Sequence, residues 1–286
     1  KELAAMKRID FANLFPQLNG GAYAQKEGSN YGGNNYKNDP ELGGKLTVTW
    51  ELDLWGNLRW AKDKSIAQFL GSIEAQRALK MSIVSEVAQA YFELVALDNE
   101  LNIVRQTLYA RKEGVRLAKL RFEGGLTSET SYQQAQVEYA RTATLVPELE
   151  RKISLKENDI AFLAGEYPHR IQRSILPEEV KLPETVGLPS TLLERRPDVR
   201  EAEQKLIAAN ASVGIAYTNM FPRLSLTAQY GVESEEFSDF FKSPIHYISG
   251  NLLTPLFAMG KYRATLKAKK AAYEQECYSY EKSVLT

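Results

Sequence analysis

The sequence predicts a mainly α-helical protein with a membrane β-sheet: long coiled-coil hairpins of an α-barrel continue into the strands of a twelve-stranded β-barrel shared by three copies. Three observations predict this fold: a tandem repeat, strands in which polar and apolar residues alternate, and a heptad pattern over a long proline-free stretch. Four strands are too few to close a barrel, and sheet edges cannot be left bare in lipid. Several copies must therefore share one barrel if the strands cross a membrane.

The tandem repeat consists of two short motifs that each occur twice. An apolar helix end leads into Phe-Pro and then two strand-like stretches, and a Gly-x-x-Arg step leads into a long helix. The period is far above the 20 to 50 residues of solenoids, so two large halves are expected to lie side by side. The repeated motifs are Phe15-Pro16 with Phe221-Pro222, and Gly56-x-x-Arg59 with Gly260-x-x-Arg263.

The repeat predicts three parts: a first copy at 1–163, an irregular, proline-punctuated linker at 164–196, and a truncated second copy at 197–286. In the first copy we expect strands at about 15–25 and 44–54, a loop from Gly28 to Pro40 between them, and helices at about 57–122 and 127–163. In the second copy we expect a helix at about 197–220, strands at about 222–233 and 246–256, and the start of a helix at 260–286.

Strict alternation from Lys45 to Leu54, and again after Arg223, places apolar and polar side chains on opposite faces of a sheet. A tilted strand of this length crosses the hydrocarbon layer, and Trp55 at its end suits an interfacial aromatic belt. An ordinary antiparallel sheet with one wet face shows the same alternation, so both interpretations remain open. The residues expected to face lipid are Leu46, Val48, Trp50, Leu52, Leu224, Leu226 and Tyr230, and those expected to face a lumen are Thr47, Thr49, Glu51, Ser225, Thr227 and Gln229.

A heptad pattern runs through the proline-free stretch after Asn57 and indicates coiled-coil packing. Its apolar positions include Leu94 and Leu101, and Arg111 is its polar exception. A turn ends this helix, and Thr127 or Ser128 is expected to cap the next one. The turn either simply closes the hairpin or forms a docking point. Its residues are Gly124, Gly125, Leu126 and Thr127.

Composition excludes several other functions. The formal net charge is zero, which gives no support to a nucleic-acid partner. A single cysteine and two isolated histidines give no support to a disulfide framework or a metal site, and no cofactor motif or catalytic triad is evident, so an enzyme is not expected. The sequence also has no run of about 18 apolar residues.

Four segments together carry a family resemblance that covers nearly the whole chain. The chain resembles the TolC-family outer-membrane efflux factors, in particular their NodT-type lipoprotein branch. The segments are Leu188-Pro189-Ser190-Thr191-Leu192-Leu193-Glu194-Arg195-Arg196-Pro197-Asp198-Val199-Arg200, Trp50-Glu51-Leu52-Asp53-Leu54-Trp55-Gly56, Phe221-Pro222-Arg223-Leu224-Ser225-Leu226 and Tyr280-Glu281-Lys282-Ser283-Val284-Leu285-Thr286.

The resemblance implies a homotrimeric channel in the Gram-negative outer membrane that extends into the periplasm. It implies a passive conduit for drugs or other small molecules in a tripartite, RND-type system associated with antibiotic resistance. The partners would be a periplasmic adaptor, an inner-membrane pump and outer-membrane lipid. The family's adaptor-docking motif corresponds to Gly124-Gly125-Leu126-Thr127, with Gly124 in place of a valine.

Two other functions remain open at this stage: the outer-membrane duct of a type I protein secretion system, and a coiled-coil scaffold that forms no channel. Family members begin with a signal peptide and a lipidated cysteine and end with a second hairpin. The sequence shows none of these, so we expect it to be a fragment of a lipid-anchored protein.

Overall fold

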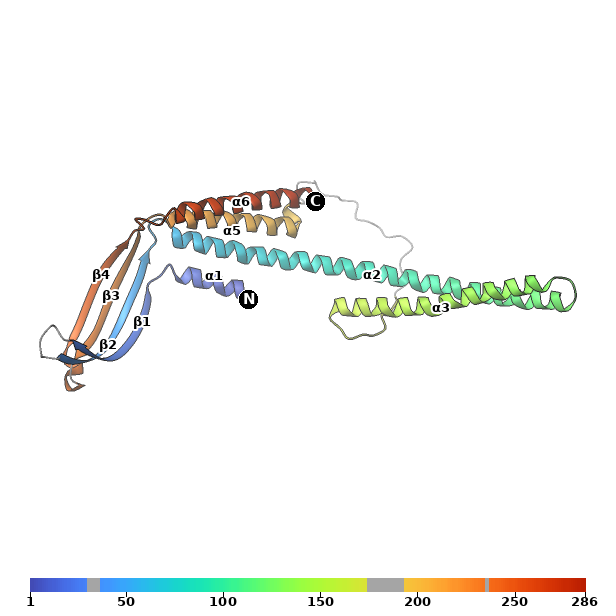
Figure 1. Cartoon of the computed structure of the whole chain (residues 1–286), viewed down its shortest axis with the longest axis horizontal. Helices are drawn as coiled ribbons and strands as arrows, with labels where there is room; N and C mark the ends of the chain where they lie inside the picture. The colour runs from blue at the N-terminus through green and yellow to red at the C-terminus, as the bar shows by residue number, and fades with distance from the viewer. Residues whose placement is uncertain (30–36, 174–192, 235–236) are drawn as a thin grey trace. The chain divides into compact units, whose positions relative to one another are not determined.

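The computed structural model describes residues 1–29, 37–173, 193–234 and 237–286 (Figure 1). The chain divides into two compact units, one made of Lys1–Ala78 and Gly187–Thr286 and the other of Leu79–Val186. Most of the linker expected at 164–196 lies outside the described residues, and its described part up to Arg173 is irregular.

The first unit contains a four-stranded sheet and several helices. Its strands are β1 (Gln17–Ser29), β2 (Lys37–Leu52), β3 (Arg223–Ser234) and β4 (Pro244–Leu253), and its helices are α1 (Glu2–Ala12), the beginning of α2 (Asn57–Glu123), α5 (Pro197–Thr218), the 3-10 helix η1 (Phe237–Lys242) and α6 (Lys261–Leu285). The second unit contains the rest of α2 and α3 (Glu129–Ala164).

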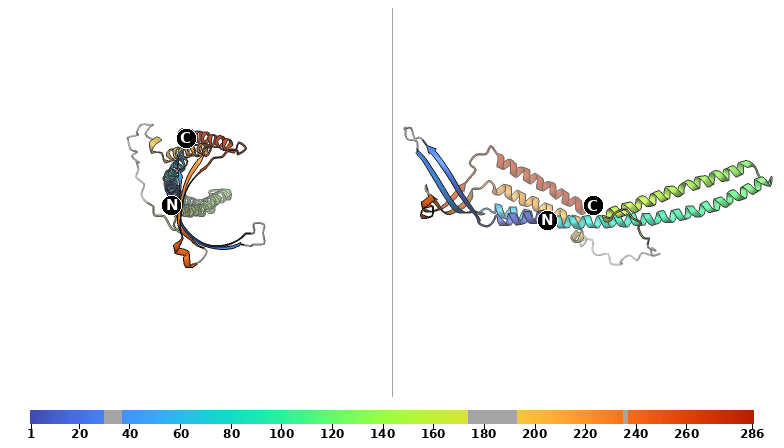
Figure 2. Two further views of the ribbon diagram at one scale, coloured as in Figure 1. Left: turned by 90° about the vertical axis from the view of Figure 1, so that its left-hand side faces the viewer. Right: turned by 90° about the horizontal axis from the view of Figure 1, so that it is seen from below.

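The sheet is antiparallel throughout, in the order β1-β2-β3-β4. Its register pairs Gln17 with Thr49, and Thr49 in turn with Thr227 of β3. The strands curve together, as the left view of Figure 2 shows. Among the described strands, β1 and β4 each have a neighbour on one side only, which leaves two edges without a partner in this chain.

The first two strands are longer than the alternation predicted. The expectation of a loop over Gly28–Pro40 is wrong at both ends, because β1 continues to Ser29 and β2 begins at Lys37. Main-chain pairing extends this hairpin without any need for side-chain alternation. The hydrogen-bonded ladder between β2 and β3 begins only at Leu42, so no β3 residue lies opposite Pro40. The missing N–H of Pro40 therefore leaves no β3 carbonyl without its donor.

The helices of the first unit pack closely. The Ser65 hydroxyl of α2 donates to the Asp10 carboxylate of α1 over 2.5 Å, and the Lys7 ammonium lies 4.7 Å from the centre of the Phe69 ring. A Cβ atom on Gly214 of α5 would meet the Trp60 ring at 2.5 Å, so glycine is required for this close approach. Helices α5 and α6 run side by side (Figure 1).

The second unit is a helical hairpin whose core follows the predicted heptads. The hydrophobic core of the hairpin contains Ala90, Leu94, Leu101, Leu149, Ile153 and Ile160. Leu94 is fully buried. The polar exception Arg111 forms an ion pair with Glu138 of α3, so the heptad position is satisfied by charge in place of apolar burial.

The two sequence motifs that repeat also share their local geometry. Gly56 and Gly260 are both left-handed, with φ of 81° and 77°, and the carbonyl of each accepts a hydrogen bond of 2.9 Å from the residue four positions later. Before the Phe-Pro motif, the N–H of Asn13 and the N–H of Asn219 each donate to the carbonyl four residues earlier over 3.0 Å. The division of the whole chain into two copies stays a prediction.

Candidate functional site

The strand register places the predicted residues of β2 and β3 in two separate groups. Directly paired residues of an antiparallel sheet have their side chains on the same face. Every β2 residue expected to face lipid is paired with an apolar or aromatic β3 residue, and every one expected to face a lumen is paired with a polar β3 residue. The apolar pairs are Leu46 with Tyr230, Val48 with Ala228, Trp50 with Leu226 and Leu52 with Leu224, and the polar pairs are Thr47 with Gln229, Thr49 with Thr227 and Glu51 with Ser225.

The outer strands continue both faces. On the apolar face Leu18 of β1 lies opposite Val48, and Ile248 of β4 lies opposite Ala228. Leu18 is 67% exposed and Ile248 82% exposed. A contiguous apolar face of this kind marks an interaction surface, because side chains of this size are seldom gathered in water. Which environment covers this face stays a prediction.

On the polar face one tyrosine bridges three strands, which sequence reasoning did not detect. The Tyr23 hydroxyl donates to the Glu41 carboxylate over 2.7 Å, and it lies 3.2 Å from a Glu233 carboxylate oxygen. The ring crosses Gly43, where a Cβ atom would lie 2.3 Å from the ring carbon that carries the hydroxyl. The Lys45 ammonium lies 5.3 Å from the ring centre. Only the register brings these residues together.

Two tryptophans bind the ends of the sheet to neighbouring main chain. The indole N–H of Trp50 donates to the Leu14 carbonyl over 3.1 Å, and that of Trp55 donates to the Pro222 carbonyl over 2.8 Å. The Trp55 ring stacks on Phe221 with ring centres 5.0 Å apart. Both indoles are partly exposed, with an apolar body and a polar group that is hydrogen-bonded, as is usual for aromatic residues at a membrane interface.

The crossing from β2 into α2 is fixed by Asp53. Its carboxylate accepts hydrogen bonds from the main-chain N–H of Leu58 over 3.0 Å and of Arg59 over 2.9 Å, at the positive end of the helix dipole. The Arg59 guanidinium also forms an ion pair with the same carboxylate over 3.2 Å. The strand and the helix are therefore joined by one compact set of charge-assisted hydrogen bonds.

The hairpin turn has a left-handed glycine and an exposed leucine. Gly125 has φ of 70°, and the N–H of Leu126 donates to the Arg121 carbonyl over 2.8 Å, which closes the end of α2 in a Schellman-type turn. The Leu126 side chain is 81% exposed. Ser128 occupies the N-cap position of α3 but makes no side-chain hydrogen bond to the helix main chain, so the expected cap is wrong in this respect.

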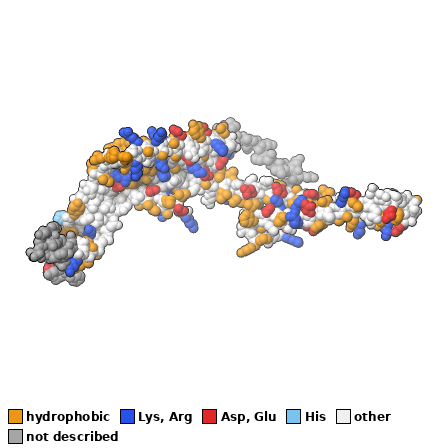
Figure 3. Space-filling model, viewed as in Figure 1, with side chains coloured by type: hydrophobic (Ala, Val, Ile, Leu, Met, Phe, Trp, Pro, Cys, Tyr) orange, Lys and Arg blue, Asp and Glu red, His pale blue; other side chains and the backbone are white. Residues whose placement is uncertain are grey.

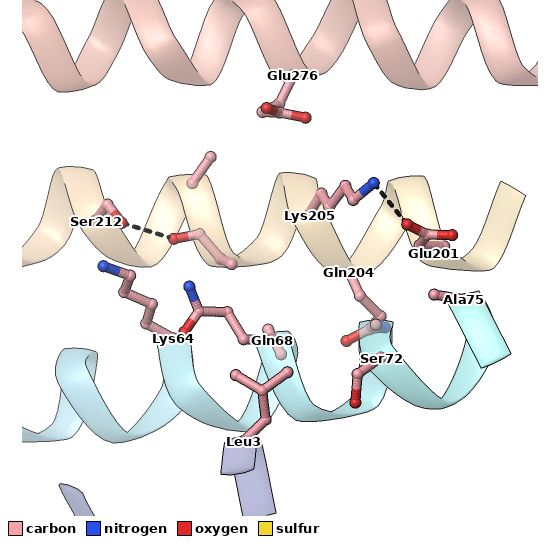
Figure 4. A pocket seen from close by; sticks show the side chains of 14 residues that line it. Leu3, Lys64, Gln68, Ser72, Ala75, Glu201, Gln204, Lys205, Ser212 and Glu276 are labelled. Carbon is pink, nitrogen blue, oxygen red and sulfur yellow. Dashed lines mark hydrogen bonds and ion pairs between the residues drawn. The ribbon is translucent and has the colours of Figure 1, made fainter. Parts of the chain in front are cut away.

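An open groove lies among the helices of the first unit, as Figure 4 shows. Lys64, Gln68 and Ser72 of α2 line one side of the groove. Gln204 of α5 points toward Ser72, and Glu276 of α6 lies on the other side of α5. Lys205 is ion-paired with Glu201 over 2.6 Å. The groove follows from the spacing of the helices.

Within the described ranges, no cluster of three or more His, Cys, Asp or Glu side chains is arranged to hold a metal ion. Within the same ranges, none of the helices has a stretch both long and apolar enough to span a membrane.

Three characterised relatives cover much of the chain. The pyoverdine export outer membrane protein OpmQ of Pseudomonas aeruginosa is 32% identical over 100% of this chain and 62% of its own length. The outer membrane protein OprJ of the same species is 35% identical over 83% of this chain and 50% of its own length. The cation efflux system protein CusC of Escherichia coli K12 is 29% identical over 99% of this chain and 63% of its own length. The chain thus spans less than two thirds of each relative.

Solved structures share the fold. A membrane protein from Pseudomonas aeruginosa matches with a TM-score of 0.92 and 31% identity, over 99% of this chain and 68% of that one. The outer-membrane channel OprN matches with a TM-score of 0.92 and 27% identity, over 99% and 65%. These matches confirm the predicted fold class of long helical hairpins combined with a membrane sheet.

The family resemblance noted in the sequence is confirmed by an independent match. The model of the family described as outer membrane efflux protein matches residues 4–166 and 188–286, which is most of the chain. The matched ranges include the four strands, the hairpin and both strand-to-helix crossings. The chain belongs to the outer membrane efflux protein family.

Proposed function

We propose that this chain forms part of a passive export channel that crosses the outer membrane and extends into the periplasm. As a member of its family it is an outer membrane protein. The observation that carries the proposal is the register, which separates apolar and polar side chains onto opposite faces of the curved sheet. Membrane barrels require this pattern, with apolar residues toward lipid and polar residues toward water.

The two unpartnered sheet edges support assembly from several copies. A lipid-exposed edge leaves main-chain groups without hydrogen bonds, which is costly in hydrocarbon. Pairing of β4 in one copy with β1 in the next satisfies both edges, and three copies supply twelve strands. We therefore propose a homotrimer in which each chain forms one third of the barrel.

The channel supplies a path and no energy. We propose that a periplasmic adaptor and an inner-membrane pump complete the system, and that the adaptor docks at Gly124, Gly125, Leu126 and Thr127. The exposure of Leu126 supports this role for the turn. OpmQ is named for pyoverdine export and CusC for cation efflux, so these names indicate efflux as a class and support no single cargo.

Conductance in planar bilayers tests the channel. The full-length product is expected to give discrete current steps, whereas a coiled-coil scaffold gives none. The absence of steps from folded, trimeric protein would rule the proposal out.

Paired substitutions test the two faces of the sheet. Val48→Arg is expected to impair membrane assembly, because an arginine on the lipid face near the midplane costs about 2 to 4 kcal/mol. Thr49→Arg places the same charge one residue along, on the polar face, and is expected to assemble. Heat-modifiable gel mobility measures assembly, and equal effects of the two substitutions would refute the assigned faces.

The docking turn is tested by Leu126→Asp, with Leu117→Asp on the side of α2 as the matched control. Site-specific cross-linking to the adaptor in intact cells is expected to fall at least about tenfold for the first and little for the second, since an interface anchor contributes more than its surroundings. Equal cross-linking in both variants would exclude the turn as the docking point.

A further inference from the structure

The crossing from β4 into α6 exposes three large apolar side chains in close succession. Leu256 is 91% exposed, Phe257 83% and Met259 87%. They follow Pro255, between the end of β4 at Leu253 and the start of α6 at Lys261. Figure 3 shows hydrophobic side chains gathered in this region and basic side chains along α6. Large apolar groups exposed together indicate a contact surface.

A run of positive charge begins directly after these residues. The first ten residues of α6 contain Lys261, Arg263, Lys267, Lys269 and Lys270 and no acidic residue. Among the residues that the structure describes, none of these five cations forms an ion pair. The corresponding cation of the first crossing, Arg59, is paired with Asp53. The charges at the second crossing are therefore available to an anionic partner.

The positions of the two groups match the layers of a membrane surface. The apolar residues follow the end of β4 closely, a few positions after Leu252, the last β4 residue on the apolar face, which is paired with Leu224. Along α6 at 1.5 Å per residue, Lys261 and Arg263 lie within about 5 Å of Gly260, and Lys270 lies about 15 Å away. The headgroup layer of each leaflet is about 5 to 8 Å thick, so the first two cations fall within it and the last does not.

We propose that this crossing is a membrane anchor that binds anionic phospholipid. Leu256, Phe257 and Met259 insert at the acyl boundary of the leaflet on the helical side, and Lys261 and Arg263 bind the headgroup phosphates. Basic residues beside an inserted apolar group prefer anionic lipids to zwitterionic ones. This inference rests on the proposed membrane-spanning role of the sheet, and it assigns a lipid class to one specific crossing.

Lipid quenching tests the anchor in the full-length product. Cys277→Ala removes the native thiol, Phe257→Cys then carries a bimane label, and the protein is reconstituted in bilayers that contain brominated phosphatidylglycerol or brominated phosphatidylcholine. We expect quenching by both lipids, with phosphatidylglycerol more effective by at least about twofold. In the Lys261→Glu/Arg263→Glu background the ratio is expected to fall to about one. Lys269→Glu/Lys270→Glu changes the net charge equally and is expected to leave the ratio unchanged.

Three results would overturn the anchor. Quenching by neither lipid would show that protein covers the crossing, with a second copy as the candidate. Equal quenching by the two lipids in the parent protein would contradict the assigned headgroup contacts. So would an equal fall of the quenching ratio in the two charge variants. Heat-modifiable gel mobility checks the folding of each variant. Current steps in planar bilayers, measured on the same preparations, separate the two proposals. Current steps without quenching overturn only the anchor, whereas the absence of current steps from the unmodified protein counts against the channel itself.

Discussion

The two strand-to-helix crossings arise from related sequence motifs, but different interactions hold them. Both contain a left-handed glycine followed by the same hydrogen bond into the helix. In the first crossing Asp53 binds two N–H groups of α2 and the Arg59 guanidinium. Phe257 precedes Gly260 by the same three positions by which Asp53 precedes Gly56, and α6 has no side-chain cap at its start. Similar backbone turns therefore support an internally fixed crossing after β2 and an outward-facing crossing after β4.

The largest expected effect is loss of the Asp53 cap. Asp53→Ala leaves two N–H groups at the start of α2 without their acceptor, and its carboxylate is only 12% exposed. We expect the free energy of unfolding to fall by about 2 kcal/mol, most of it from the main-chain bonds because Arg59 is largely exposed. Urea unfolding in detergent measures the change.

Phe257→Ala is the matched control for this prediction. The side chain is almost fully exposed and contacts no other aromatic ring in the described part of the chain, so the change in detergent is expected to be below about 0.5 kcal/mol. Similar losses in the two variants would mean that the crossings are held in the same way.

A smaller effect of opposite sign is expected at Met259. This residue has φ of 47°, and it is the single non-glycine residue with positive φ in the described chain. Met259→Gly relieves the left-handed strain, but glycine also increases the conformational entropy of the unfolded chain. The net effect is expected to raise the free energy of unfolding by about 0.5 kcal/mol. Met259→Ala retains Cβ and is expected to give no gain. Thermal unfolding in detergent distinguishes them, and equal gains would assign the effect to loss of the exposed side chain.

The smallest effect concerns charge pairing between α2 and α3 of the helical hairpin. A hydrogen bond from Lys156 lowers the pKa of Glu93, and one from Arg111 lowers the pKa of Glu138, both from the ordinary value of 4.5. Because the folded pKa is lowered, this stabilisation is present above the ordinary pKa and is lost as the pH falls through the folded value. We expect hydrogen exchange in the hairpin to accelerate below about pH 4.5, after correction for chemical exchange rates.

The matched comparison for this prediction is α6, whose basic residues have no such pairs among the described residues. Its protection is expected to change less over the same pH range. Glu93→Gln is expected to reduce the pH dependence of the hairpin, and an unchanged dependence in that variant would exclude the Lys156 pair as a cause.

Much of the fold could be predicted from the sequence because its periodic patterns are long. Heptad spacing predicted the burial of Leu94 and Leu101, and alternation predicted that Leu46, Val48 and Trp50 share a face. The start of β2 at Lys37 could not be predicted, because the residues near Pro40 are poor strand formers that are ordered by pairing with β1.

The contacts of the candidate site were less predictable. The bridge from Tyr23 to Glu233 requires the register of three strands, which no local pattern contains. The role of Asp53 has a local signal in the sequence, because an aspartate shortly before a helix is a common cap. Its second contact, with the Arg59 side chain, depends on the left-handed turn at Gly56.

The position of Tyr23 over Gly43 also constrains the order in which this sheet can change during evolution. Any side chain at position 43 would occupy the space of the ring, so the ring would have to move and give up Glu41 and Glu233. A smaller residue at position 23 must therefore come first, and only then does position 43 accept a side chain. The two sites form an epistatic pair, because the steric cost of a side chain at position 43 depends on the residue at position 23.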